Sequence, residues 1–290
     1  MNDPLSPLTA PPPRYLLESD SSDEEGQGTY PTYEQSGPSK PKIRLNNESQ
    51  VSIEGVDKVT NLEEVVIGIG QAGKYVSKLA ESQGQGLRIG NVKIGSKNIG
   101  GVLQGTTDGH KIISLEEGEL SHEESWEVVK VLIDTIKARK WIIVTSYVPS
   151  MYIPSSSERS QRLSEPPIRI LSPTASTNDY KLSEVDGVRA FDAPNYLTGI
   201  AGGIVSLASH PSTTIPSPKT ILLPLPLSSL APSKVSAALS GPGASSAFSV
   251  RSGQSRIRWT EDDDEPYSAP GMGRVKGLKR GLEDISSMYM

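Results

Sequence analysis

The chain has 290 residues, of which 35% are apolar, and glycine and proline contribute 27 and 23 residues. This composition predicts one folded domain with sizeable loop-rich or disordered parts. The sequence contains no cysteine, which excludes disulfides, cysteine-ligated zinc and cysteine nucleophiles. The first 27 residues carry the whole net charge of −5, so the remainder is neutral. A nucleic-acid-binding protein would carry a basic surplus there, and we expect no nucleic-acid partner.

No signal peptide is recognisable at the start of the sequence, and no run of about 18 apolar residues is present. We therefore expect no membrane association and a location in the cytoplasm or the nucleus. Residues 1–58 are predicted to form a disordered acidic and proline-rich lead, with the stretches "PLTAPPPRY" and "ESDSSDEEGQG". Within it, Ser21 and Ser22 each have an acid three residues further on, which suits an acid-directed kinase. The alternative for this lead is a solubilising tail.

The stretch "EVVIGIGQAGKYV" begins at Glu64 and is typical of a strand, a glycine-rich turn and a helix. Its glycines, Gly68, Gly70 and Gly73, have the spacing of a dinucleotide-binding turn. Such a site also needs an acid about 20 residues further on, to hold the ribose hydroxyls. Residues 88–98 contain no acid. We therefore interpret the glycines as a tight structural turn and expect no cofactor, with a nucleotide-binding oxidoreductase as the alternative function.

The stretches "LRIGNVKIG" and "HKIISLE" are predicted strands that follow this helix. Ser121 and Glu124 form a capping-box pattern, which predicts the start of a second helix. That helix would place Trp126 and Val129 on its buried face, together with two isoleucines at helical spacing. The run from Trp141 to Val144 then favours a central strand. This order predicts an α/β fold, a single domain with a central mixed sheet flanked by helices.

We place this domain at residues 59–251. Within it, residues 149–190 have the composition of a surface loop. An apolar helix is predicted in residues 193–209, opened by Pro194 and kept narrow by small residues, and "PSKVSAALSG" predicts another. Residues 252–290 are expected to form a charged loop and a flexible C-terminal tail.

Candidate metal ligands are few. His110, His122 and His210 are far apart in the sequence, and no pair of them has the spacing of a helical metal site. The acidic run "EDDDE" at 261–265 lacks the spaced ligands of a calcium loop. We interpret it as a solvated run of charge and expect no metal. No Gly-x-Ser-x-Gly elbow is present, and nothing in the sequence indicates a catalytic residue.

The sequence ends in Met288, Tyr289 and Met290. A hydrophobic residue, a tyrosine and a final residue with a free carboxylate resemble the tail with which partners of the core proteasome enter pockets of its α-ring. Such a tail offers a ring to bury, a phenol for hydrogen bonding and a carboxylate for a lysine or backbone amides. These three residues are the predicted partner-binding site.

The order of features along the chain is similar to the fungal proteasome assembly chaperone 1 family. The likeness is carried by "KWIIVTSYVPSMYI" (140–153), by "APNYLTGIAGGIVSLAS" (193–209) and by the C-terminal tail. The resemblance implies a non-enzymatic chaperone that pairs with a second assembly chaperone and docks on the α-subunits of the core proteasome. A longer charged insert at 251–287 departs from the family's pattern. A disordered phosphoprotein scaffold is a further alternative.

Overall fold

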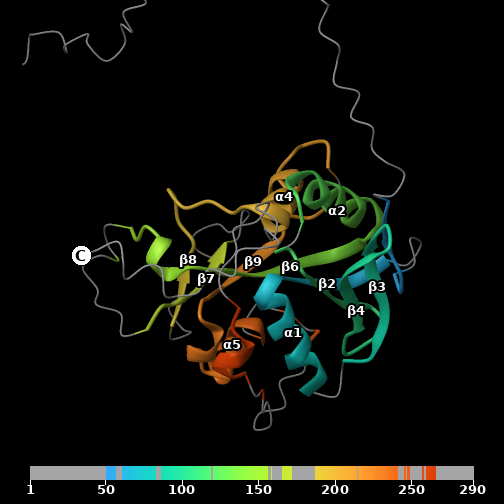
Figure 1. The fold of residues 1–290 in the computed structure, drawn as a ribbon. Coiled ribbons are helices and arrows are strands. Elements are labelled where there is room, and N and C mark those ends of the chain that lie inside the picture. Colours follow the sequence, from blue (N-terminus) through green and yellow to red (C-terminus); the bar gives the residue numbers. More distant parts are fainter. Residues whose placement is uncertain are drawn as a thin grey trace, which may run out of the picture. The chain divides into compact units, whose positions relative to one another are not determined.

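One mixed β-sheet with helices on both faces makes up the described part of the chain (Figure 1). The computed structural model describes residues 50–56, 61–82, 86–118, 120–155, 158, 165–171, 187–213, 215–240, 245, 247–248, 257 and 259–265. The strands are β1 (Val51–Ile53), β2 (Asn61–Ile69), β3 (Arg88–Ile94), β4 (Lys97–Gln104), β5 (His110–Leu115), β6 (Lys137–Tyr147), β7 (Ile168–Leu171), β8 (Val188–Ala190) and β9 (Lys219–Pro224). The predicted α/β class with a central mixed sheet is confirmed.

The strands lie in the order β1-β3-β4-β5-β2-β6-β9-β7-β8. Strands β5, β2, β6 and β9 are parallel to one another, whereas antiparallel pairs join β4 to β5 and β7 to β9. Val65, Val66 and Ile67 of β2 are all fully buried. Such a continuous apolar run is expected of a parallel strand that is covered on both faces.

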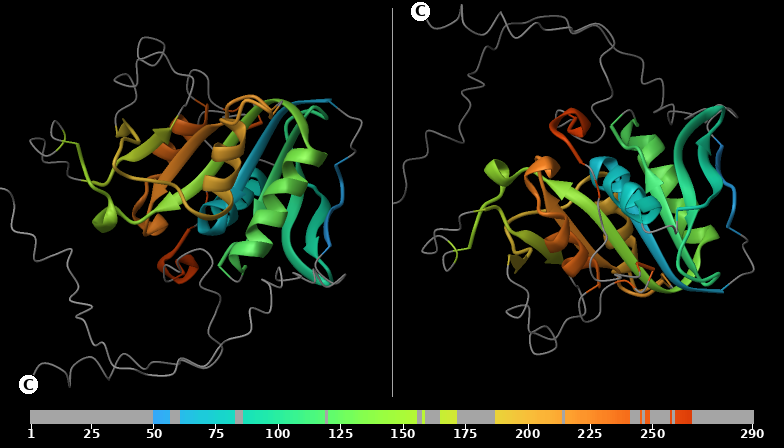
Figure 2. Two further views of the ribbon diagram at one scale, coloured as in Figure 1. Left: turned by 90° about the horizontal axis from the view of Figure 1, so that it is seen from above. Right: turned by 90° about the horizontal axis from the view of Figure 1, so that it is seen from below.

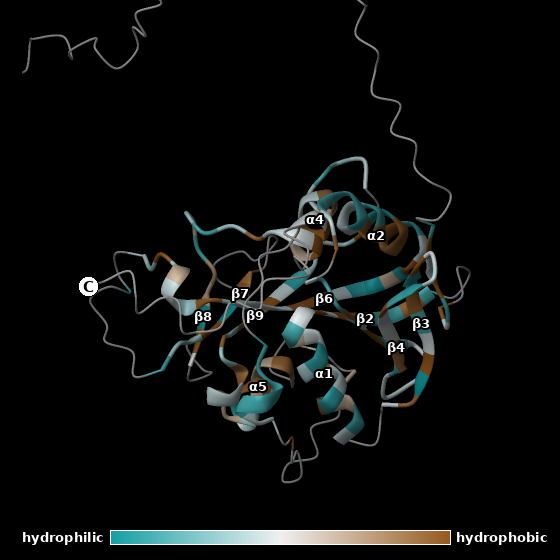
Figure 3. Ribbon diagram, viewed as in Figure 1, coloured by the Kyte–Doolittle hydropathy of each residue, from teal (hydrophilic) through white to brown (hydrophobic). Residues whose placement is uncertain are grey.

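The helices cover the two faces of the sheet in pairs. Their bounds are α1 (Gly70–Ser82), α2 (His122–Thr135), α4 (Gly199–Ala208) and α5 (Pro232–Ser240). Helices α2 and α4 lie over one face, and α1 and α5 lie over the other (Figures 1 and 2). Hydrophobic and hydrophilic residues alternate along α1 and α2, as expected of helices that bury one side (Figure 3). No helix in the described residues is long and apolar enough to cross a membrane.

Side chains of the central strands divide between two hydrophobic cores, one on each face. Val65 and Trp141 belong to the core that contains residues of α2 and α4. Their chain neighbours Val66 and Ile142 belong to the core that contains residues of α1 and α5. This alternation follows from the two-residue period of a strand. The cores fix the sheet and its helices, and thereby the place where the parallel strands end.

Helix α2 begins with the predicted capping box. The side chain of Ser121 accepts from the amide of Glu124, and the carboxylate of Glu124 accepts from the amide of Ser121. The predicted buried face is wrong for Trp126, whose side chain is 43% exposed and lies beside Lys130. The buried face is turned by about one residue and carries the smaller side chains of Val128, Val129 and Leu132, which pack closely on the sheet.

Three strands lie in segments that were predicted to be irregular. Strand β1 falls inside the expected lead of residues 1–58, but it pairs with β3 and Val51 is buried. Strands β7 and β8 fall inside the loop expected at 149–190, and they extend the sheet beyond β9. Each is only three or four residues long. Such short strands give little periodic signal, because they gain their stability from neighbours that are distant in the sequence.

Helix α4 starts later than predicted. Pro194 does not open it, because the helix begins at Gly199 and Thr198 is its N-cap residue. The residues between Pro194 and Thr198 form a loop instead. The buried side chains of α4 include Ile200 and Ile204, so the expectation of an apolar core helix is confirmed.

Candidate partner-binding site

The predicted tail residues Met288, Tyr289 and Met290 lie outside the described residues. The two internal segments that carry the family resemblance, 140–153 and 193–209, are described almost throughout as strand, loop and helix. They meet at the edge where the parallel strands end, and the glycine turn ends at the same edge. This edge is the candidate site.

The glycine turn joins the end of β2 to the start of α1. Gly70 has a φ of +62°, a backbone conformation that favours glycine. A Cβ atom at Gly73 would lie 2.5 Å from the carbonyl oxygen of Gly68, so helix and strand are too close for a larger residue. The interpretation of these glycines as a tight structural turn is confirmed.

The sheet order argues against a dinucleotide site at this turn. In a dinucleotide-binding fold, the acid that holds the ribose comes from the strand next to the glycine turn. Here the strand that follows α1 is β3, and β4 and β5 separate it from β2. At the start of α1, Glu265 also lies close, because its Oε1 is 2.5 Å from Nζ of Lys74. The absence of a cofactor stays a prediction.

A cavity of about 300 Å³ lies beyond the ends of β2, β6 and β9. The connection after β2 enters α1 on one face of the sheet, whereas the one after the neighbouring strand β5 leads to α2 on the other. Adjacent connections therefore diverge, which leaves a crevice outside the strand ends. In α/β sheets this is the usual place for a binding site.

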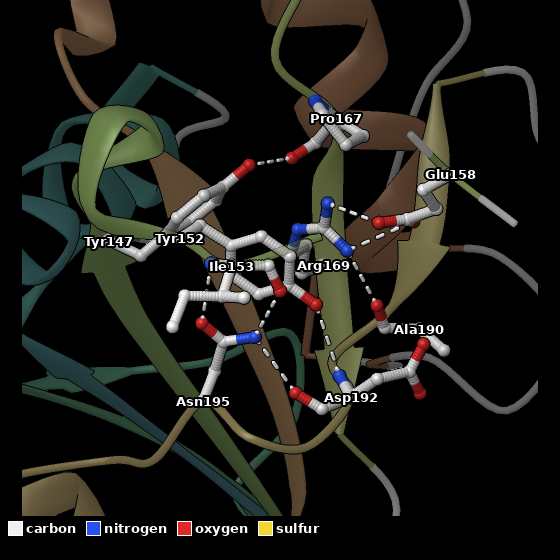
Figure 4. A network of polar contacts seen from close by, with 9 residues as sticks. All are labelled: Tyr147, Tyr152, Ile153, Glu158, Pro167, Arg169, Ala190, Asp192 and Asn195. Atoms are coloured by element: carbon white, nitrogen blue, oxygen red, sulfur yellow. Dashed lines mark hydrogen bonds and ion pairs between the residues drawn. The ribbon is translucent and has the colours of Figure 1, made fainter. Parts of the chain in front are cut away.

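Asn195 holds the two loops at the cavity together. Its Oδ1 accepts from the backbone amide of Ile153 at 2.8 Å, and its Nδ2 donates to the carbonyl oxygens of Ile153 and Asp192 at 2.8 and 2.9 Å (Figure 4). The amide of Asp192 donates to the hydroxyl of Tyr152 at 3.2 Å. Asn195 thereby fixes the loop after β6 against the loop before α4.

Behind these loops, Arg169 of β7 is buried in a polar network (Figure 4). Its guanidinium forms a two-pronged ion pair with Glu158 at 3.0 and 3.1 Å and lies 3.4 Å from the ring centre of Tyr152. Burial opposes the charge of Arg169, but the hydrogen bonds and charge of Glu158 raise its pKa overall. Burial also raises the pKa of Tyr147 to about 12, and its hydroxyl donates to the carbonyl oxygen of Pro167 at 2.6 Å. These contacts hold the loop after β6 rigidly against the sheet.

Three large apolar side chains lie exposed at the rim of the cavity. Met151 is 67% exposed, Ile153 is 48% exposed and Tyr196 is 81% exposed. The first two come from the loop after β6. Tyr196 follows Asn195, whose hydrogen bonds between the two loops form what we call the clamp. Aromatic and methionine side chains are enriched in protein interfaces. A rigid loop pair that presents such residues is suited to binding another protein.

Glu117 lies at the inner wall of the cavity and is 8% exposed. Its Oε1 accepts from the backbone amide of Ile200 at 2.5 Å, at the first turn of α4. Burial raises the pKa of this carboxyl to about 7, although the hydrogen bond from Ile200 acts in the opposite direction. Glu117 is therefore partly protonated at neutral pH, and a cation that entered the cavity would favour its charged form.

The acidic run at 261–265 is not the solvated run that the sequence predicted. Asp264 accepts from the amides of Leu227 and Ser228 at 3.0 and 3.2 Å and from the indole of Trp259 at 2.9 Å. Asp263 forms an ion pair with Lys78 of α1 at 2.5 Å. These contacts attach the segment to the main body of the fold. In the described residues, no group of three or more histidine, aspartate or glutamate side chains could hold a metal ion.

No family model matches the chain, and no curated protein matches it. Among solved structures, a protein of unknown function from Thermoplasma acidophilum is similar, with a TM-score of 0.40 and 13% identity over 59% of this chain and 70% of that one. Two structures of Pyrococcus furiosus PbaA, an archaeal homolog of proteasome-assembly chaperone, have TM-scores of 0.37 at 14% and 12% identity. They cover 60% of this chain and 71% and 76% of theirs. We transfer no residue role from these structures.

Sequence reasoning missed Asn195 and Glu117. Asn195 was assigned to a helix, and Glu117, which directly follows the predicted strand "HKIISLE", received no role. The positive signal for Asn195 was its place directly after Pro194, where asparagine is typical of a turn. No local signal marks Glu117, because its burial results from the packing of α4, which begins more than 80 residues later.

Proposed function

We propose that the protein is a chaperone for assembly of the core proteasome, without catalytic activity of its own. In this proposal it acts as a heterodimer with a second assembly chaperone and docks its C-terminal tail, Met288, Tyr289 and Met290, into the α-ring. We propose a location in the cytoplasm and the nucleus. The tail and the resemblance of residues 140–153 and 193–209 support this function.

The contact between these two segments is the observation that carries the proposal. Asn195 of one segment binds the backbone of Ile153 in the other through two hydrogen bonds of 2.8 Å. Segments 40 residues apart in the sequence therefore form one surface, with Met151 and Tyr196 exposed beside the clamp. An exposed apolar rim on a rigid support favours a protein-binding role, since a catalytic site would be expected to shield such side chains from water.

The tail is tested with two variants of the full chain. One lacks Tyr289 and Met290, and the other carries one additional residue after Met290, which keeps the ring but moves the carboxylate. Burial of the tyrosine ring contributes a few kcal/mol at roughly 25 cal/mol per Å². Ordering the three residues costs about 1–2 kcal/mol each, so affinity must depend on the rest of the surface as well.

We expect both variants to lose co-purification of α-subunits and to retain co-purification of the partner chaperone. Retention of the partner chaperone controls for folding. If both variants retain α-subunits at the level of the parent chain, the tail is not the anchor. If the parent chain itself does not co-purify the partner chaperone, the proposed heterodimer is contradicted.

A further inference from the structure

The cavity beside the clamp has an acidic and oxygen-rich inner wall. Among the described residues that line it, the charged side chains are those of Glu117 and Glu265. The carboxylate of Glu265 already pairs with Nζ of Lys74 at 2.5 Å. The Oε1 of Gln71 has no hydrogen-bond partner in the described residues, but the atom is itself enclosed and does not open into the cavity. The carboxylate of Glu117 is therefore the acidic group that this wall offers to an occupant with N–H groups.

The lining of the cavity also includes apolar and aromatic side chains. Tyr152 and Phe191 lie with their ring centres 5.7 Å apart, and Met151, Ile153 and Tyr196 complete the rim. A side chain with an apolar stem and a cationic head matches this arrangement, since the stem would pack against the rim and the head would reach the acceptors. Arginine and lysine are the two residues of this kind. A phosphate or a terminal carboxylate would instead meet the carboxyl of Glu117, and no lysine, arginine or histidine is among the described residues that line the cavity.

The size of the cavity agrees with a single side chain. Its volume of about 300 Å³ lies at the lower limit of sites for small molecules. A guanidinium is planar, pairs with a carboxylate through two donors and stacks on aromatic faces. Arginine therefore fits the combination of Glu117 and the aromatic rim better than lysine.

We propose that this cavity receives an arginine side chain of a partner polypeptide, with its head at Glu117. Apolar residues that flank this arginine would pack on Met151, Ile153 and Tyr196. The inference rests on the proposed function and deepens it, because it gives the chemistry that a protein partner presents to this surface. The charge of Glu117 sets the preference for a cation, and the rim sets the preference for a polypeptide.

The experiment compares acetyl-arginine amide with its uncharged isostere, acetyl-citrulline amide. Both are titrated into the ¹⁵N-labelled full chain, and the amide signals of Gly118, Thr145 and Ser146 at the cavity are followed. For a ligand of this size we expect a Kd on the order of 1 mM for the arginine probe. The citrulline probe should bind at least about tenfold more weakly, because it leaves the buried carboxylate without a cation.

The matched variants are Glu117→Gln and Glu116→Gln. Glu117→Gln keeps the acceptor for the amide of Ile200 and removes the charge, so the preference for arginine over citrulline should disappear. Glu116 is the neighbouring residue, but its side chain is 64% exposed and it does not line the cavity. Glu116→Gln should keep the preference. The parent chain and Glu117→Gln, each titrated with both probes, form a double-mutant cycle. This cycle isolates the interaction between the charge of Glu117 and the charge of the arginine probe.

Several results would overturn the inference. They are equal binding of arginine and citrulline, an unchanged preference in Glu117→Gln, no shift of the cavity signals with any probe, or shifts of these signals with inorganic phosphate or ATP. A third variant of the full chain replaces Arg274, Lys276, Lys279 and Arg280 by glutamine. If the arginine probe binds only in this variant, the occupant is the chain's own basic segment and not a partner. None of these results depends on α-subunits, so failure here is distinct from failure of the tail experiment.

Discussion

The buried carboxyl of Glu117 makes a quantitative prediction about stability and pH. Its pKa in the folded chain is about 7, compared with an ordinary value of 4.5 for a glutamate side chain. The folded chain therefore binds this proton more tightly than the unfolded chain does. The resulting stabilisation is fully present below pH 4.5 and is lost as the pH rises through 7. At about 1.4 kcal/mol per pH unit, the loss is on the order of 3 kcal/mol.

The substitution Glu117→Gln removes the titration and keeps an acceptor for the amide of Ile200, 2.5 Å away in the parent chain. The variant should have the same free energy of unfolding as the parent below pH 4.5. As the pH rises, it should become more stable than the parent, by on the order of 3 kcal/mol above pH 7. Urea unfolding of both chains across this range measures the difference, and subtraction removes the other titrating groups. The tyrosines and Glu265 that line the same cavity are present in both chains.

A difference that does not change with pH would show that Glu117 titrates normally in the folded chain. If the variant became less stable than the parent with rising pH, the pKa of Glu117 would be lowered, not raised, in the folded chain. The carboxylate would then be favoured in the folded state, through the first turn of α4 or an unidentified cation. Either result would refute the description of this wall as desolvated. The expected result also serves the binding experiment, because a variant that is more stable at neutral pH cannot lose binding through unfolding.

Two further substitutions test the contacts around this site. Gly73→Ala places a Cβ atom 2.5 Å from the carbonyl oxygen of Gly68 and should lower the free energy of unfolding in urea by on the order of 1–3 kcal/mol. The control is Gly118→Ala, where a Cβ atom has open space, and it should change this free energy by less than about 0.5 kcal/mol. Asp264→Asn replaces a carboxylate that accepts from two amides and an indole. It should lower the free energy of unfolding by about 1–2 kcal/mol and change the fluorescence of Trp259. The control Asp262→Asn, at an exposed position, should change neither quantity.

The sequence predicted the parts of the fold whose signals are local and continuous. Strand β2 has a buried apolar run, α2 has a capping box, and the glycines before α1 reveal a tight turn. Short edge strands such as β1 and β8 were missed, because three residues carry no period and their pairing depends on distant partners. Trp126 was assigned to the core on its helical spacing from other apolar residues, although close packing of α2 on the sheet favours smaller side chains.

The site shows a different limit of sequence reasoning. The glycine motif correctly marks where β2 ends and α1 begins, which is also where adjacent connections diverge and the cavity forms. What the cavity can bind is decided by residues from other segments. Glu117 follows β5, and Glu265 reaches the start of α1 from a segment nearly 200 residues away in the sequence. The same turn that is typical of a phosphate site therefore stands beside two carboxylates. The motif specifies the backbone geometry of the crevice, whereas acids from distant segments contribute the charged groups on its wall.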